Sequence, residues 1–353
     1  MEKFKLMVRI PDLKGYFRER KQPLSLFLTA GLAVIIFGII STGSLLSTNP
    51  WAGLRESAAK PLANSEKLSY WSSQIEKIGA EKAYLEFKKE VSALPLPLQH
   101  GEVHFIGPLL YEKLGPQGFV ACDTDFNYGC YHGFFAAALS DKGVALLTDL
   151  NKACEEKYNP RPSPCQHGIG HGLMSYLGRA KLVEALEYCK LTNQKDPLHG
   201  CTSGLFMEYN TSTHFSLDGV NDIRPLNSLN PYEPCNTTVP GEFRRSCYFE
   251  IGLWWREVYN RDFTKIGQLC QNIADSEERK ACFSGLALVI APTTSYNAYE
   301  TVKLCQEMPS LEGELICRAG SYLVFDGLDA VKHLAPKICE DLASPERELC
   351  QKK

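Results

Sequence analysis

The placement of the cysteines constrains the fold of this chain more than any other feature of its sequence. All fourteen lie after residue 121, and they form seven close pairs whose members are 8 to 12 residues apart. The second cysteines of the first six pairs follow one another at steps of 35, 36, 46, 35 and 35 residues. A nearly fixed period of this length is typical of helical-repeat arrays. The pairs are Cys122–Cys130, Cys154–Cys165, Cys189–Cys201, Cys235–Cys247, Cys270–Cys282, Cys305–Cys317 and Cys339–Cys350.

Close pairing with no cysteine left over predicts seven local disulfides. Disulfides persist in oxidising compartments, so we expect the folded part outside the cytoplasm, in a periplasmic, extracellular or lumenal space. Each disulfide is expected to join the end of one helix to the start of the next. The predicted fold class is therefore all-α, a disulfide-stapled α/α solenoid of roughly 35-residue repeats.

A glycine usually stands three residues after the second cysteine of a pair. Because glycine is unfavourable inside a helix by about 1 kcal/mol, its recurrence predicts a close helix–helix approach at that point. The single step of 46 residues marks an insertion over residues 211–234, which we expect to form a loop on the binding face. The recurring glycines are Gly133, Gly168, Gly204, Gly285 and Gly320.

This arrangement resembles the cysteine-rich, tetratricopeptide-like helical-repeat proteins, in which local disulfides also join successive helix pairs. The resemblance covers about residues 95–353 and rests on the period and on the cysteine placement. It implies an α/α solenoid and, most often, a binding scaffold. It assigns no functional residue.

The N-terminal segment predicts a membrane anchor. Residues 1–22 form a basic tail, and no charged residue occurs between Gln22 and Leu54. Residues 23–46 are apolar and long enough, at about 1.5 Å per residue, to cross the lipid bilayer as a helix. The preceding basic residues predict a signal-anchor whose N-terminus stays in the cytoplasm. The alternatives are a cleaved signal peptide and a buried core helix.

The rest of the chain divides by composition and repeats. Residues 47–65 are predicted to be a linker, and residues 66–353 an extracytoplasmic helical-repeat domain that begins with a helical pattern over 66–93. Within it, a histidine-rich part (98–214) precedes repeats that look purely structural (235–353). The net charge of −3 gives no basic field, so we expect no nucleic-acid partner.

The histidines are unevenly distributed, with seven of the eight between residues 100 and 214. His167 and His171 are four residues apart on a predicted helix, which places both imidazoles on one face, as helical metal sites require. A matching Gln-His-Gly-x-x-His segment repeats this spacing with His100 and His104, and His132 holds the place of His167 one repeat earlier. These five residues predict a transition-metal site that takes zinc, copper or iron.

Within this group, we expect the first ligands to be His132, His167 and His171, because packed helices lie about 8–10 Å apart and neighbouring repeats can converge on one ion. His100 and His104 extend this shell or form a second site. The alternative is that the histidines are hydrogen-bonded core residues without a metal.

Carboxylates near the histidines predict possible chemistry. Glu208 is our candidate catalytic residue, as a general base toward a metal-bound water. Glu208, Asp123 and Asp125 are also candidates for ligating the metal or orienting an imidazole. Ser203 is more often a cap or packing residue than a nucleophile.

Two functions follow from the sequence. The first is a histidine-rich metal-binding protein, which can extend to a metal-dependent enzyme with its site within residues 98–208. The second is a non-catalytic scaffold that binds an extracytoplasmic protein through a groove or through the inserted loop.

Overall fold

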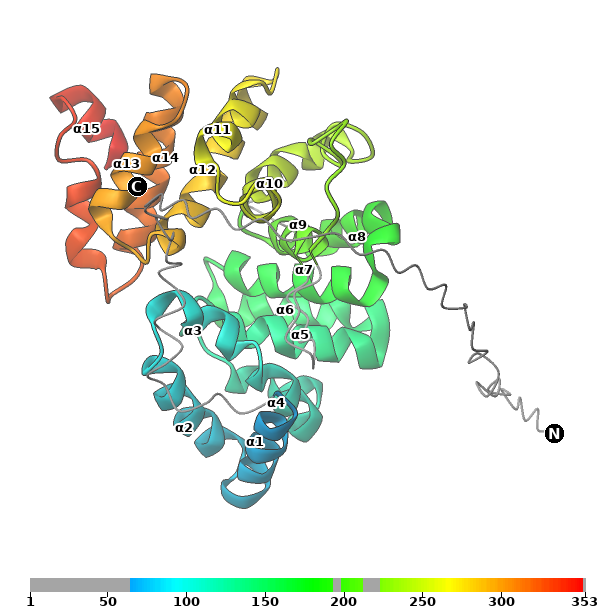
Figure 1. Ribbon diagram of the computed structural model, residues 1–353. Helices are drawn as coiled ribbons and strands as arrows, with labels where there is room; N and C mark the ends of the chain where they lie inside the picture. The colour runs from blue at the N-terminus through cyan, green and yellow to red at the C-terminus, as the bar shows by residue number, and fades with distance from the viewer. Residues whose placement is uncertain (1–63, 193–197, 212–222, 352–353) are drawn as a thin grey trace, which may run out of the picture. The chain divides into compact units, whose positions relative to one another are not determined.

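The computed structural model describes residues 64–192, 198–211 and 223–351, all within one compact unit. This part of the chain is all-α, as predicted, and its only extended pairing is an isolated bridge between Thr211 and Ile223. Figure 1 shows the helices in chain order.

Several predictions fall outside the described residues. They are the basic tail (1–22), the membrane segment (23–46) and nearly all of the linker (47–65). His214 and part of the insertion also lie outside. Among the helices that are described, none is both long and apolar enough to cross a membrane.

The helices alternate between long, largely buried ones and shorter ones. Short 3₁₀ turns, including η2 (Pro116–Ala121), η5 (Lys190–Thr192) and η7 (Lys332–Ile338), connect them. The α-helices are α1 (Asn64–Ile78), α2 (Ala80–Ser92), α3 (Leu96–Val103), α4 (Ile106–Leu114), α5 (Gly129–Lys142), α6 (Leu147–Tyr158), α7 (Ser163–Leu177), α8 (Leu182–Cys189), α9 (Cys201–Asn210), α10 (Arg244–Val258), α11 (Phe263–Gln271), α12 (Ser276–Thr293), α13 (Ala298–Gln306), α14 (Leu311–Asp326) and α15 (Ser344–Cys350).

All seven predicted disulfides are present, and no cysteine is free. Their Cα atoms are 5.5 to 6.1 Å apart, an ordinary span for a disulfide. Each of the first six ties a helix of the long series to the segment that precedes it, and the seventh joins Cys339 to the short α15. For example, Cys154 of α6 is bonded to Cys165 of α7.

The long helices pack one upon the next. Helix α4 packs against α5, α5 against α7, α7 against α9, α9 against α10, α10 against α12, and α12 against α14. The shorter α6, α8, α11 and α13 contact the long helices beside them and form a second layer. Helix α3 contacts α5 and also the distant α12 (Figure 1). The array therefore bends enough to bring an early helix against a late one.

The recurring glycines mark close backbone contacts, as predicted. A Cβ on Gly133 would lie 2.0 Å from the carbonyl oxygen of His104, and one on Gly204 would lie 1.9 Å from that of His167. At Gly285 the corresponding distance to the Phe249 carbonyl oxygen is 1.8 Å. Real side chains do not tolerate such distances, so glycine is required at these three positions.

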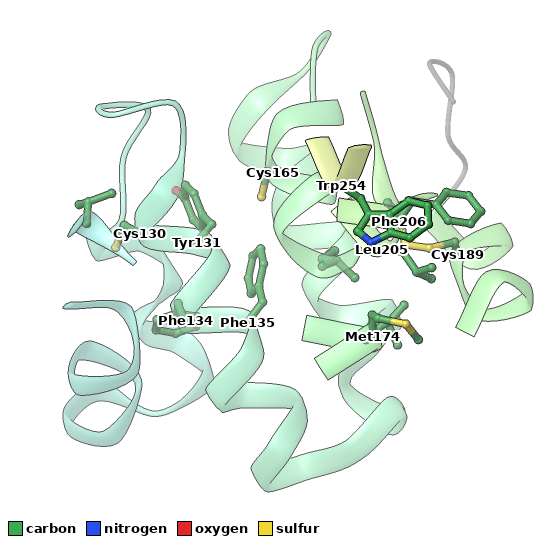
Figure 2. Packing of buried hydrophobic residues seen from close by; sticks show 14 of the residues in the cluster. Cys130, Tyr131, Phe134, Phe135, Cys165, Met174, Cys189, Leu205, Phe206 and Trp254 are labelled. Carbon is green, nitrogen blue, oxygen red and sulfur yellow. A yellow bond between two sulfur atoms is a disulfide. The ribbon is translucent and has the colours of Figure 1, made fainter. Parts of the chain in front are cut away.

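Aromatic side chains fill the spaces between these helices. Figure 2 shows Tyr131, Phe134 and Phe135 projecting from α5, all of them inaccessible to solvent. A Cβ on Gly168 of α7 would lie 3.0 Å from the Phe135 ring, so the ring occupies the space that this glycine leaves. Further along, Trp254 of α10 is buried and donates a hydrogen bond of 2.6 Å to the carbonyl of Arg224. The core is therefore continuous across successive repeats.

The helix boundaries differ from the sequence expectation in the later repeats. The second cysteine lies at the start of α5 and α9, but α12 and α14 each begin six residues before theirs. The side chains of Asp275 and Ser310 accept hydrogen bonds from backbone N–H groups and start these helices early. Before Cys339 the predicted α-helix is a 3₁₀ helix instead, and it contains Pro336, which has no N–H to donate.

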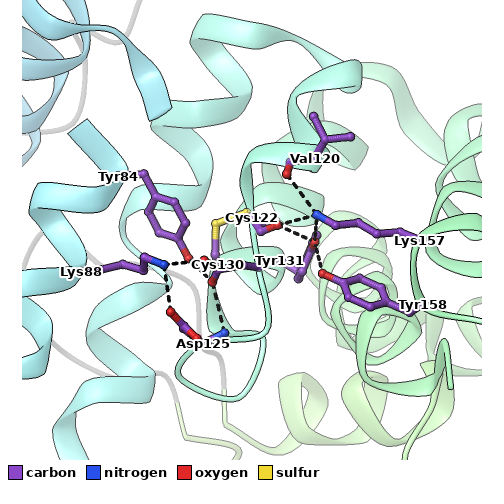
Figure 3. Close-up of a disulfide and its surroundings, with 10 residues drawn as sticks. Tyr84, Lys88, Val120, Cys122, Asp125, Cys130, Tyr131, Lys157 and Tyr158 are labelled. Carbon is purple, nitrogen blue, oxygen red and sulfur yellow. Dashed lines mark hydrogen bonds and ion pairs between the residues drawn. A yellow bond between two sulfur atoms is a disulfide. The ribbon is translucent and has the colours of Figure 1, made fainter. Parts of the chain in front are cut away.

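A polar network surrounds the first disulfide, between Cys122 and Cys130 (Figure 3). Lys157 of α6 donates to the carbonyls of Val120 (3.0 Å) and Cys122 (2.7 Å) and to the Tyr131 hydroxyl (2.9 Å). Burial lowers the pKa of this lysine. The network fixes the start of α5, where His132 follows Tyr131.

Candidate metal centre

The structure brings all five predicted histidines together. They form two groups of three whose ligand nitrogens lie within 4.8 Å of one another, and His132 belongs to both groups. The first triad, as we term it, consists of His100, His104 and His132, and the second triad of His132, His167 and His171. The two are adjacent, since the ring centroids of His104 and His171 are only 6.3 Å apart.

In the first triad the rings meet edge to face. Their centroids are 4.6 to 5.0 Å apart, at interplanar angles of 62° to 81°. The Nε2 atom of His104 lies 3.2 Å from Nε2 of His100 and 2.9 Å from Nδ1 of His132. Three inclined rings with their nitrogens turned inward can share one ion.

The second triad contains a similar pair. The Nε2 atoms of His167 and His171 are 3.1 Å apart, with the rings at 62°. Two nitrogens that each bind a tetrahedral zinc ion at about 2.0–2.1 Å lie roughly 3.3 Å apart. The Nε2–Nε2 separations of the His100–His104 and His167–His171 pairs therefore match the spacing of neighbouring ligands on one ion.

Hydrogen bonds fix the tautomers of three rings. The Nδ1 atom of His100 donates to the Phe126 carbonyl (2.7 Å), and Nδ1 of His171 donates to the Glu208 carboxylate (3.0 Å). The Nδ1 atom of His167 lies 3.1 Å from the Ser203 hydroxyl, which in turn donates to Glu250 at 2.5 Å. A hydroxyl that gives its proton to Glu250 accepts from His167. Each ring therefore donates through Nδ1 and turns its Nε2 toward the centre, which is usual for a metal-binding histidine that a hydrogen bond orients.

Opposed nitrogens of this kind favour a positive charge between them. When both rings are neutral, the Nε2 lone pairs of His167 and His171 face each other at 3.1 Å and repel. Burial, reinforced by the neighbouring imidazoles, holds the pKa of His167 well below its ordinary value, which disfavours a proton on that ring. A metal ion relieves the repulsion without protonating either ring.

Close helix packing places the histidines. The carbonyl of His104 contacts Gly133 of α5, and the carbonyl of His167 contacts Gly204 of α9. These backbone approaches bring α3, α5, α7 and α9 near enough for side chains from separate repeats to meet. The turn before α5 contributes as well: Phe126, Asn127 and Tyr128 have positive φ values of 53°, 54° and 62°. Such strain in non-glycine residues is often found at functional sites, and here the turn delivers the Phe126 carbonyl to His100.

The histidines differ in their exposure to solvent. His132 and His171 are almost fully buried, whereas His100 and His167 are half-buried. Burial lowers the pKa of His100, and it lowers those of His104 and His132 well below the ordinary range. The rings are therefore neutral near pH 7 and available as ligands.

Of the predicted carboxylates, only Glu208 lies beside the centre. Asp123 accepts from Tyr84 and pairs with Lys88, and Asp125 pairs with the same lysine, so both belong to a structural ion-pair group (Figure 3). His199 contacts the Phe249 ring and joins neither triad. Glu208 lies beside the centre, on His171.

Sequence reasoning missed two of the groups at the site. The Phe126 carbonyl is main chain and left no signal in the sequence. Glu250 did leave one, because it occupies the position three residues after the second cysteine where the other repeats have glycine. Burial raises the pKa of Glu250 to about 7. Only the Ser203 hydroxyl lies between this carboxyl group and the His167 ring.

No family model, curated protein or solved structure matches this chain. The site must therefore be interpreted from its own geometry.

The donor set defines what the centre can bind. Both triads consist of imidazoles alone, with no carboxylate or thiolate among the groups found in the described residues. Imidazole nitrogens suit divalent ions late in the first transition series, above all copper and zinc. Ser203 is not placed as a nucleophile. In a catalytic triad the carboxylate orients the histidine and the histidine faces the serine. Here the Ser203 hydroxyl lies between His167 and Glu250 instead.

Proposed function

We propose that this protein is a membrane-anchored, extracytoplasmic helical-repeat protein whose five-histidine cluster binds a divalent transition metal. The apolar segment over residues 23–46 supports the anchor, and the seven disulfides support the oxidising compartment. The successive packing of disulfide-linked helix pairs supports a solenoid architecture.

One observation carries the metal-binding proposal. His167 and His171 present Nε2 lone pairs to each other at 3.1 Å, and acceptors at their Nδ1 atoms hold both rings in that tautomer. A core histidine that serves only packing uses its nitrogens to donate and accept hydrogen bonds; it does not aim a lone pair at another lone pair.

Glu208 has a defined place in this proposal. Its carboxylate is 4 % exposed and accepts from His171, which orients that ring and strengthens it as a ligand. The same carboxylate is the proton acceptor that we would test first if a metal-dependent reaction is found. We expect a substrate to reach the ion beside His100 and His167, which are only half-buried.

The proposal is tested by the metal content of the full-length chain, purified in its oxidised form and measured by elemental mass spectrometry. We expect at least one zinc or copper ion per chain in the parent and none in a His167→Ala/His171→Ala double variant with the same helical circular dichroism. His333→Ala serves as the control, since this exposed histidine lies in the later repeats and should leave the metal content unchanged. If neither parent nor variant binds metal after reconstitution with zinc, copper and iron, the scaffold interpretation is favoured instead.

A further inference from the structure

His132 is the one residue shared by the two triads. It projects from α5, between the first histidine pair at the end of α3 and the second pair on α7. Its ring centroid lies 4.6 and 5.0 Å from those of His104 and His100, and 4.3 and 5.2 Å from those of His171 and His167. It is therefore in contact with all four other rings.

The two nitrogens of His132 have different surroundings. Nδ1 lies 2.9 Å from Nε2 of His104, and so it belongs to the first triad. Nε2 is buried and has no hydrogen-bond partner among the described residues, although the side chain is only 3 % exposed. A buried nitrogen without a partner costs free energy and calls for an explanation such as an ion at that position.

The other four histidines divide evenly. His100 and His104 turn their Nε2 atoms toward each other on one side of His132, and His167 and His171 do the same on the other side. Each pair supplies two ligands, which is one too few for the three-histidine shell of a typical open zinc site. One ring with both nitrogens engaged completes both shells.

From this geometry, we propose that the cluster holds two divalent transition-metal ions and that the His132 ring bridges them, with Nδ1 on the first ion and Nε2 on the second. The inference rests on the proposed metal-binding function and specifies its stoichiometry. When the second ion binds, the N–H bond of His132 breaks, the freed lone pair forms the new metal–nitrogen bond, and the proton passes to solvent. No oxidation or reduction takes place.

The second site needs a small side-chain movement. The rings of His132 and His171 are nearly parallel, at 22°, and an ion lies in the plane of each ring that binds it. One of these rings therefore rotates when the second ion enters. The first triad, with its inclined rings, requires no such rotation and should fill first.

Copper provides the sharpest test, because imidazoles bind Cu²⁺ more tightly than the other divalent ions of the series. Full-length protein is titrated with Cu²⁺, and bound copper is compared with the spin intensity in electron paramagnetic resonance. A single bridging ring couples the two unpaired electrons. We expect two copper ions per chain and the loss of most of the spin intensity when the second ion binds.

Two variants separate the bridge from simple ligation. His132→Ala should restore a spin intensity equal to its copper content, and His104→Ala should bind one copper with its full signal. The second variant keeps the test valid if the first fails to fold, and His333→Ala should behave as the parent does.

The outcomes distinguish this inference from the proposed function. Saturation at one copper per chain, bound through these histidines, would overturn the bridge and leave the metal-binding function intact. Two coppers with undiminished spin intensity would show two independent sites. Absence of copper binding would overturn both proposals.

Discussion

Helices α5 to α9 and helices α10 to α14 are built alike and yet differ in chemistry. In both regions a disulfide ties each long helix to the segment before it, and a glycine admits a neighbouring backbone. The first region places imidazoles where its helices approach, whereas in the later one the corresponding positions are apolar or small. The same disulfide and glycine pattern holds the later helices, which lack these imidazoles, so we expect the framework to fold without the site.

The comparison predicts that acid weakens the early region first. His104, His132 and His167 have pKa values held well below 6.5 by burial, while in the unfolded chain they titrate near 6.5. Below that pH the unfolded state binds more protons, so the free energy of unfolding falls as the pH falls. We expect the metal-free protein to lose about 3 kcal/mol between pH 7.5 and 5.5.

Urea unfolding and amide hydrogen exchange would measure this effect. Amides of α5 and α7 should lose protection at pH 5.5 before those of α12 and α14. Equal loss in both regions would contradict the assignment of the acid sensitivity to the histidines. The His167→Ala/His171→Ala variant should show a shallower pH dependence, since His167 is one of the residues responsible.

The glycine contacts give a matched pair of substitutions across the two regions. Gly204→Ala would press a methyl group on the His167 carbonyl and Gly285→Ala on the Phe249 carbonyl, at 1.9 and 1.8 Å. Each should lower the free energy of unfolding by about 2 to 3 kcal/mol, the cost of overpacking a tight contact. Only Gly204→Ala should also weaken metal binding in the folded protein, because it displaces His167. If Gly285→Ala weakens binding equally, the two regions are not separable as we describe.

The smallest expected effect concerns the orientation of a single ring. Glu208→Gln removes the charge that His171 donates to, and should weaken metal binding about 10- to 100-fold, the usual cost of losing an outer-shell partner. Glu278→Gln is the control in the later region, where a buried carboxylate pairs with Arg244. Isothermal titration with zinc should show full affinity in that control. Unchanged affinity in Glu208→Gln would mean that the carboxylate does not orient the ligand.

Much of this framework could be predicted from the sequence because it repeats. The close pairing and regular spacing of the cysteines predicted all seven disulfides, and the recurring glycines predicted close contacts between helices. The spacing of His167 and His171 predicted a shared face. A repeat period, however, predicts contacts only between neighbouring repeats. His104 and His171 belong to repeats that are two apart, and they meet because the array bends until α3 contacts α12. That bend is a sum of small rotations between helices, which no local pattern encodes.

The exception in a periodic pattern proved as informative as the pattern. Glu250 replaces the repeated glycine at one position only, and it lies on the hydroxyl that orients His167. From the sequence, Glu250 falls within the repeats predicted to be purely structural, residues 235–353. Its role depends on Ser203, which lies 47 residues earlier in the chain.

The local pairing of the cysteines has a consequence for biogenesis. Partners are separated by only 8 to 12 residues, so if the repeats enter an oxidising compartment in chain order, both members of a pair arrive before the next pair does. The order of emergence itself then selects the native partner. Oxidation can keep pace with export, repeat by repeat, with little need for an isomerase to correct mispaired thiols.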